Sequence, residues 1–228
     1  ALDLAGHGRS SHRSRDSSYD IWIDVGEVIG VADQMGWDRF SLIGHSRGAA
    51  IAGLIAGTYP DRIVQLALID GYVPMPSEPD DSAKQLKKAI RENKRFANSQ
   101  PTFFPDIERA IQARVKGFVP LQEEGAALLA QRGVSEGPKG FYWANDQRLK
   151  AASFVKFSKD YLESFFTSIL ARVLMIQAEN SALSPGRQQN ALFEWVRHMD
   201  IQKVSGSHHL HLEGEAEDVA RLIQKFLV

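Results

Sequence analysis

The stretch Gly44-His45-Ser46-Arg47-Gly48 decides the fold of this chain. It follows a short apolar run, Phe40 to Ile43, and precedes a run of small and apolar residues, Ala49 to Tyr59, that Pro60 ends. A strand that turns directly into a helix strains the residue between them, so the residues two positions away on each side must be small. The pattern therefore predicts a nucleophile elbow with Ser46 at its tip; the alternative is a glycine-rich turn around a surface serine.

Strands and helices alternate on both sides of this stretch. Apolar residues recur at three- and four-residue steps from Asp20 to Met35, which predicts an amphipathic helix, and Ile63 to Ile69 reads as a buried strand. Such alternation indicates a parallel sheet with helices on both faces. The other elements expected are the strands Ala1 to Leu4, Arg172 to Ile176 and Ile201 to Val204, and the helices Arg187 to His198 and Ala216 to Leu227.

The alternation stops in the middle of the chain. Between Pro74 and about Phe166 the pattern predicts helices separated by turns and no strand. We therefore expect a core formed by residues 1–73 and 167–228, interrupted by a helical cap over residues 74–166. The helices expected there are Lys84 to Phe96, Ile107 to Val115, Leu121 to Gln131 and Phe154 to Phe166.

Composition excludes several classes of protein. The chain has 228 residues, of which 43% are hydrophobic, enough for a substantial core without a metal or disulfide staple. Lys and Arg number 27 against 28 Asp and Glu, so no charge excess favours nucleic acid as a partner. No apolar run approaches the ~20 residues of a membrane span. The absence of cysteine rules out a thiolate nucleophile and is compatible with a reducing, cytoplasmic location.

A serine nucleophile needs a base with a pKa near 7, which is the role of histidine. Three of the seven histidines lie close together in Gly206-Ser207-His208-His209-Leu210-His211, after the last expected strand. His208 is the predicted base because it comes first after two small residues, while His209 and His211 would shape the pocket. A zinc site formed by the three histidines is the alternative, and the absence of a carboxylate in the loop disfavours it.

Two carboxylates follow the appropriate strands. Asp70 comes directly after Ile63 to Ile69, and Glu179 comes 29 residues before His208. Either carboxylate would orient the imidazole, and Asp70 is favoured because it caps its strand directly. The backbone N–H of Arg47 begins the helix after Ser46 and is the predicted oxyanion donor. No cofactor or metal is expected.

With these features the chain resembles the α/β-hydrolase superfamily over its whole length, and within it the serine hydrolase-like proteins. Asp3 to Ser10 resembles the D-x-x-G-H-G-x-S segment that follows the fourth strand of that family. Segments Leu129 to Gly133 and Asn145 to Leu149 are similar to cap segments of the group. The resemblance implies an α/β-hydrolase fold, a mostly parallel sheet flanked by helices, with a helical cap.

This chain differs from the pattern of that family at several positions. Ser181 stands near the position where many members carry the triad acid, so this chain either uses Asp70 or has lost an acid. The chain starts at the equivalent of the fourth strand, so we expect that the amino-terminal strands, a second oxyanion donor and any signal peptide lie outside it. The expected partner is a small-molecule ester or acyl substrate, and His45, His209, Phe141 and Trp143 are candidates for its pocket.

The sequence thus predicts a serine hydrolase that cleaves a carboxylic ester or related acyl bond through a Ser-His-Asp triad and an acyl-enzyme. A ligand-binding protein with little turnover on the same fold, and a C–C hydrolase or perhydrolase with the same triad, stay open. The sequence does not indicate an oligomeric state.

Six basic residues recur at helical spacing from Lys84 to Arg95, which indicates a solvated helix face or, alternatively, a positive face for an anionic group.

Overall fold

The computed structural model describes residues 1–71, 73–74, 76–181 and 194–228. These residues form two compact units. One consists of Ala1–Asp20 and Asp80–Val155, and the other of Ile21–Pro79 and Lys156–Val228. The chain therefore leaves the second unit once and returns to it.

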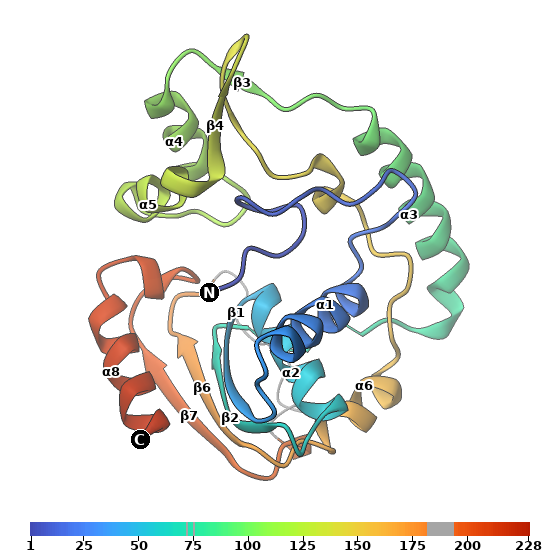
Figure 1. Cartoon of the computed structure of the whole chain (residues 1–228), viewed down its shortest axis with the longest axis vertical. Helices are drawn as coiled ribbons and strands as arrows, with labels where there is room; N and C mark the ends of the chain where they lie inside the picture. Colours follow the sequence, from blue (N-terminus) through green and yellow to red (C-terminus); the bar gives the residue numbers. More distant parts are fainter. Residues whose placement is uncertain (72, 75, 182–193) are drawn as a thin grey trace. The chain divides into compact units, whose positions relative to one another are not determined.

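A four-stranded parallel sheet forms the centre of the second unit, in the order β1-β2-β6-β7 (Figure 1). The alternation of strands and helices predicted such a parallel sheet, and the resemblance to the α/β-hydrolase superfamily implied it as well. The strands are β1 (Phe40–His45), β2 (Ile63–Ile69), β6 (Arg172–Ala178) and β7 (Met199–Val204). The helices of this unit are α1 (Ile21–Gln34), α2 (Arg47–Thr58), α6 (Lys159–Phe166) and α8 (Ala216–Leu227), with a short 3-10 turn, η3, over Leu210–Leu212.

Helices cover both faces of this sheet, with α1, α2 and α6 on one side and α8 on the other (Figure 1). Side chains alternate across a strand, so each strand supplies two cores. Ala67 and Ile69 of β2 pack with Val219 and Phe226 of α8. The next residues along β2 point to the opposite face, where α2 packs against β1 and β2. Both faces of the central strands are thus buried, as expected for a parallel sheet.

The first unit contains a small antiparallel sheet that the sequence pattern did not predict. Its strand order is β3-β5-β4, and the expectation of no strand in the middle of the chain is wrong. Gly140, with φ 109°, follows the turn between β4 and β5, and the aromatic run Phe141 to Trp143 favours a strand. The elements are α3 (Ser82–Ala97), β3 (Phe103–Phe104), α4 (Ile107–Val115), α5 (Glu123–Gly133), β4 (Val134–Gly137), β5 (Gly140–Trp143) and the 3-10 turns η1 (Pro79–Asp81) and η2 (Gln147–Lys150).

Three other expectations remain to be compared with the structure: a strand, a helix and the domain boundaries. The strand expected at Ala1 to Leu4 is wrong, because these residues pair with no described strand and Leu4 accepts a turn hydrogen bond from the His7 N–H. The helix expected over Arg187 to His198 lies largely outside the described residues. The boundaries of the predicted domains, 1–73, 74–166 and 167–228, stay a prediction.

Candidate active site

Ser46 lies at the junction of β1 and α2 with φ 54° and ψ −118°. A positive φ is uncommon for a residue with a side chain, and such strain persists only where the surroundings enforce it. Here Ile69 of β2 enforces it, because the Ile69 carbonyl accepts a hydrogen bond of 3.1 Å from the Ser46 N–H. The Ser46 carbonyl accepts from the N–H groups of Ala49 and Ala50 and so begins the helix. The turn therefore has the geometry of a strand that reverses directly into a helix.

The two glycines of the motif are not equivalent. A Cβ on Gly44 would lie 2.6 Å from the carbonyl carbon of Gly48 and 2.7 Å from the nitrogen of Ala49, distances that backbone atoms do not tolerate. A Cβ on Gly48 would meet no described atom within 4 Å. The requirement for a small residue that the sequence predicted on both sides therefore holds sterically at Gly44, while a methyl group has room at Gly48.

Three side chains from separate elements form a continuous chain of hydrogen bonds. The Ser46 hydroxyl lies 2.9 Å from Nε2 of His208, and Nδ1 of His208 lies 2.6 Å from a carboxylate oxygen of Asp70. Asp70 follows β2 and His208 lies in the loop after β7. Because the strands are parallel, their carboxyl ends meet at one edge of the sheet, and this brings together residues far apart in sequence.

The carboxylate of Asp70 is fully buried and accepts two further hydrogen bonds. The Ser181 hydroxyl donates at 2.5 Å and the Ala178 N–H at 3.1 Å. Burial raises the pKa of Asp70, but the hydrogen bonds from His208, Ser181 and Ala178 outweigh it and hold the pKa below its ordinary value. The ionised carboxylate accepts from Nδ1–H of His208, so Nε2 of the neutral ring carries the lone pair that faces the Ser46 hydroxyl.

The second carboxylate considered from sequence lies elsewhere. Glu179 is exposed, and its N–H donates to the carbonyl of Val204. Nδ1 of His208 is occupied by Asp70. Sequence reasoning did not assign Ser181 to the site, although its place just after β6, the strand that pairs with β2, brings it to the same sheet edge as Asp70.

His45 contacts the backbone of the neighbouring loop. Its Nε2 lies 2.8 Å from the carbonyl oxygen of His208, and its ring centroid lies 4.0 Å from that of His211. Burial is the main cause that lowers the pKa of His45 to about 3, and the imidazole of His211 is the next. A neutral His45 donates Nε2–H to that carbonyl. Nε2 of His45 is therefore engaged with the chain, and the pocket role expected of this residue stays a prediction.

His209 and His211 lie in the same cluster of rings. The ring of His209 is 4.9 Å from that of His208 and 5.4 Å from that of His45. Burial, followed by the nearby imidazoles of His209 and His208, lowers the pKa of His211 to about 4. Within the described ranges, no group of three or more His, Asp or Glu side chains has an arrangement suited to a metal ion.

Arg47 is the first residue of α2, so its N–H lies in the first turn of the helix. The amino-terminal end of a helix carries a partial positive charge and stabilises an anion there. The Arg47 side chain extends to α1, where its guanidinium lies 2.5 Å from the buried carboxylate of Asp24. This ion pair attaches the start of α2 to α1 and was not predicted from the sequence.

Comparison with known proteins agrees with this geometry. The model of a protein family described as the alpha/beta hydrolase fold matches residues 1–215. The chain belongs to this family. It is 29% identical to a serine hydrolase-like protein of Danio rerio, over all of this chain and 72% of that protein. It is also 29% identical to serine hydrolase-like protein 2 of Homo sapiens, over all of this chain and 77% of that protein.

A solved structure is also similar to this α/β hydrolase. The crystal structure of a hypothetical protein of Pseudomonas aeruginosa PAO1 superimposes with a TM-score of 0.94 at 38% identity, covering all of this chain and 81% of that one. The thioesterase domain from the curacin biosynthetic pathway superimposes with a TM-score of 0.79 at 24% identity, covering 96% of this chain and 78% of that one. The second likeness bears on the fold alone.

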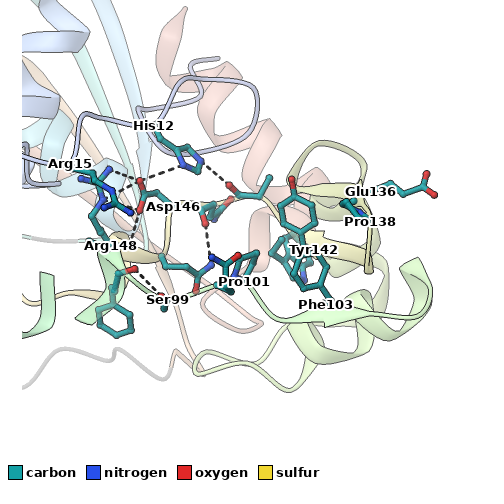
Figure 2. Close-up of a pocket in the computed structure, with 18 residues that line it drawn as sticks. His12, Arg15, Ser99, Pro101, Phe103, Glu136, Pro138, Tyr142, Asp146 and Arg148 are labelled. Atoms are coloured by element: carbon teal, nitrogen blue, oxygen red, sulfur yellow. Dashed lines mark hydrogen bonds and ion pairs between the residues drawn. The ribbon is translucent and has the colours of Figure 1, made fainter. Parts of the chain in front are cut away.

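The two pocket candidates from the middle of the chain have different surroundings. Trp143 lines a cavity of about 560 Å³ in the first unit, together with Phe96, Phe103 and Tyr142 (Figure 2), whereas Phe141 is not part of its lining. His12, which also lines this cavity, points toward the carboxylate of Asp146, with 3.5 Å between the two side chains (Figure 2). His45 and His209 belong to the second unit.

The buried pair beside this cavity holds the amino-terminal segment of the first unit. Arg148 donates to the carboxylate of Asp146 at 2.7 Å and to the carbonyl oxygens of Arg13, Ser14 and Ser17. Every nitrogen of this guanidinium thus has an acceptor within the chain, and the pair is structural.

In the part of the α/β hydrolase that the structure describes, no helix combines the length and the apolar character needed to cross a membrane.

Proposed function

We propose that this chain is a serine hydrolase that cleaves a carboxylic ester or related acyl bond. The observation that carries the proposal is the hydrogen-bonded chain from Ser46 through His208 to Asp70, with distances of 2.9 Å and 2.6 Å. This is the arrangement in which a base takes the hydroxyl proton while a carboxylate orients and stabilises the resulting imidazolium. The names of the serine hydrolase-like relatives support the same chemistry.

In the proposed mechanism Ser46 Oγ attacks the acyl carbon while Nε2 of His208 takes its proton. The carbonyl oxygen becomes an oxyanion that accepts a hydrogen bond from the N–H of Arg47 at the start of α2. His208 then gives the proton to the leaving alcohol, and an acyl-Ser46 ester remains. Water, deprotonated by His208, attacks this ester and releases the acid, which restores the serine.

Asp70 has a positioning role in this scheme. Its ionised carboxylate keeps the proton of the neutral imidazole on Nδ1, so that Nε2 is the basic nitrogen. Neither a metal nor a cofactor takes part in the proposed steps. We extend the proposal to residues 74–166 as a cap that selects the substrate, following the sequence prediction.

Labelling and turnover test the proposal together. The full chain is treated with a fluorophosphonate probe and assayed on short p-nitrophenyl esters. We expect labelling and turnover in the wild type and in Ser41→Ala, which removes an exposed serine hydroxyl from β1, and neither in Ser46→Ala. Undiminished turnover by Ser46→Ala would refute the assignment.

The same assay separates the alternatives. Tight binding of an acyl ligand by a folded chain that is not labelled would favour a ligand-binding protein on the hydrolase fold. If the chain is labelled but does not turn over esters, it is then assayed on C–C and peroxide substrates. In a C–C hydrolase the leaving carbon must be protonated as a ketone or enol, so turnover of such substrates would identify that class.

A further inference from the structure

Helix α3 packs against its own unit along one side only. Gln85 donates to the carbonyl of Ser153 at 2.6 Å, and the Ala152 N–H donates to the carboxylate of Glu92 at 2.9 Å. Ala89, on the same side, is the one residue of this 16-residue helix that is fully buried. These contacts fix which side of α3 faces the protein.

Two large apolar side chains of α3 remain exposed. Leu86 is 45% exposed and Ile90 is 54% exposed. They stand four residues apart, so they are neighbours on the helix surface and form a short apolar stripe. Exposed apolar side chains are ordinary in a soluble protein, so this pair matters through its combination with the charged residues beside it.

Basic residues lie next to this stripe. Lys87 and Lys94 stand three residues before and four residues after Ile90, which places them beside it on the helix surface. Within the described ranges, Lys84 alone among the basic residues of α3 has an ion pair, with Asp81 at 3.5 Å. The helix carries six basic residues, Lys84, Lys87, Lys88, Arg91, Lys94 and Arg95.

The charge of α3 is therefore concentrated and largely uncompensated. The one acidic residue of the helix, Glu92, is held on the packed side by the Ala152 N–H. The whole chain has a formal net charge of −1, so the cations of α3 form a local positive face on a nearly neutral protein. Such a face attracts polyanionic surfaces and loses that attraction as salt screens it.

From this combination we infer that the outer face of α3 binds the surface of an anionic lipid membrane. An interfacial helix inserts its apolar stripe at the boundary of headgroups and acyl chains, while Lys and Arg side chains extend to the lipid phosphates. Leu86 and Ile90 are suited to the first contact, and Lys87 and Lys94 to the second. A nucleic acid backbone would use the cations but would leave the exposed apolar pair without a partner.

Vesicle co-sedimentation of the full chain tests this inference without reference to enzymatic activity. The vesicles are phosphatidylcholine alone and phosphatidylcholine mixed with phosphatidylglycerol, each at low and high salt. We expect binding to the mixed vesicles only, weakened by salt, with a loss of about fivefold in affinity for each cation removed. Equal binding to both kinds of vesicle, or none to either, would overturn the inference.

Three double variants separate the contributions. Lys87→Gln with Lys94→Gln removes two cations beside the stripe, and Leu86→Gln with Ile90→Gln removes the stripe itself. Lys203→Gln with Lys225→Gln makes the same change of net charge at exposed positions outside α3. We expect the first two to lose binding and the third to retain it, with thermal unfolding used to verify that each is folded.

Two outcomes would contradict the assignment to lipid. If the Leu86 and Ile90 variant binds mixed vesicles as the wild type does, the apolar stripe has no part and the inference is wrong. If the wild type binds a DNA duplex more tightly than mixed vesicles, and that variant binds the duplex equally well, the face is a nucleic acid surface instead.

Discussion

Gly44→Ala is the substitution that best tests how the turn at Ser46 is built. The added Cβ would lie 2.6 Å from the carbonyl carbon of Gly48 and 2.7 Å from the nitrogen of Ala49. These atoms belong to the first turn of α2, so no side-chain rotation relieves the clash. Bringing the carbonyl carbon to 3.0 Å requires β1 and α2 to move apart by about 0.4 Å, and the carbonyl oxygen of Gly48, which lies closer still to the added Cβ, requires more.

The expected cost follows from this displacement. Overpacking of a rigid site costs about 1–3 kcal/mol, so the free energy of unfolding of Gly44→Ala should fall by that amount. The shift also moves Ser46 away from His208, and a misplacement of this order lowers kcat/KM by up to roughly 100-fold. Gly48→Ala is the matched control, because its Cβ meets no described atom within 4 Å. Alanine in a helix should make that variant about 0.5–1 kcal/mol more stable than the wild type.

Urea unfolding and p-nitrophenyl ester turnover measure the two effects separately. We expect Gly44→Ala to be less stable and Gly48→Ala more stable than the wild type in the unfolding experiment, and a large loss of turnover for Gly44→Ala alone. If both variants match the wild type in stability and in turnover, the steric argument for the turn is wrong. If Gly48→Ala lowers stability and turnover more than Gly44→Ala does, the space around the two glycines does not determine how each position tolerates a side chain.

The remaining predictions concern buried polar groups. Burial lowers the pKa of His45 to about 3. Between pH 6.5 and about 3 the unfolded chain therefore binds more protons than the folded one, and the free energy of unfolding falls as the pH drops. His45→Gln should flatten this pH dependence in urea unfolding. Ser181→Ala removes the 2.5 Å hydrogen bond to Asp70 and should lower kcat about 2- to 10-fold with KM unchanged in ester hydrolysis. Arg148→Met removes the guanidinium from the buried carboxylate of Asp146 and should cost about 3–5 kcal/mol at neutral pH. Hydrogen bonds from Arg148 outweigh burial and lower the pKa of Asp146 to about 2, so calorimetric scans should show the difference from wild type shrinking from pH 3.8 toward about 2.

Local patterns were enough to predict the α/β alternation. The helix expected over Asp20 to Met35 is α1 (Ile21–Gln34), and the strand expected over Ile63 to Ile69 is β2. Both segments have apolar periodicities long enough to be distinctive, because burial on one face of a helix or both faces of a strand requires them. The proximity of Ser46, His208 and Asp70 followed from the rule that parallel strands end at one edge of a sheet.

Features that depend on partners distant in the sequence were not predictable. The apolar run Ala1 to Leu4 has a strand-like composition, but a strand exists only where another strand pairs with it. The hairpin of β4 and β5 is short, and its first strand carries Ser135, Glu136 and Gly137, which have no β pattern. The hydrogen bond from His45 to the His208 carbonyl and that from Ser181 to Asp70 each join residues more than a hundred positions apart.

The pairing of the central sheet has a consequence for how this protein changes over generations. Every strand pair of that sheet joins residues within 40–69 or 172–204, and the segment from Asp80 to Val155 contributes to none of them. Insertions, deletions or exchanges within that segment leave the register of the strands that hold Ser46 and Asp70 untouched. The positions of Ser46 and Asp70 in the central sheet can therefore be inherited unchanged while that segment diverges, provided that its own structural contacts, such as the Arg148–Asp146 pair, are kept.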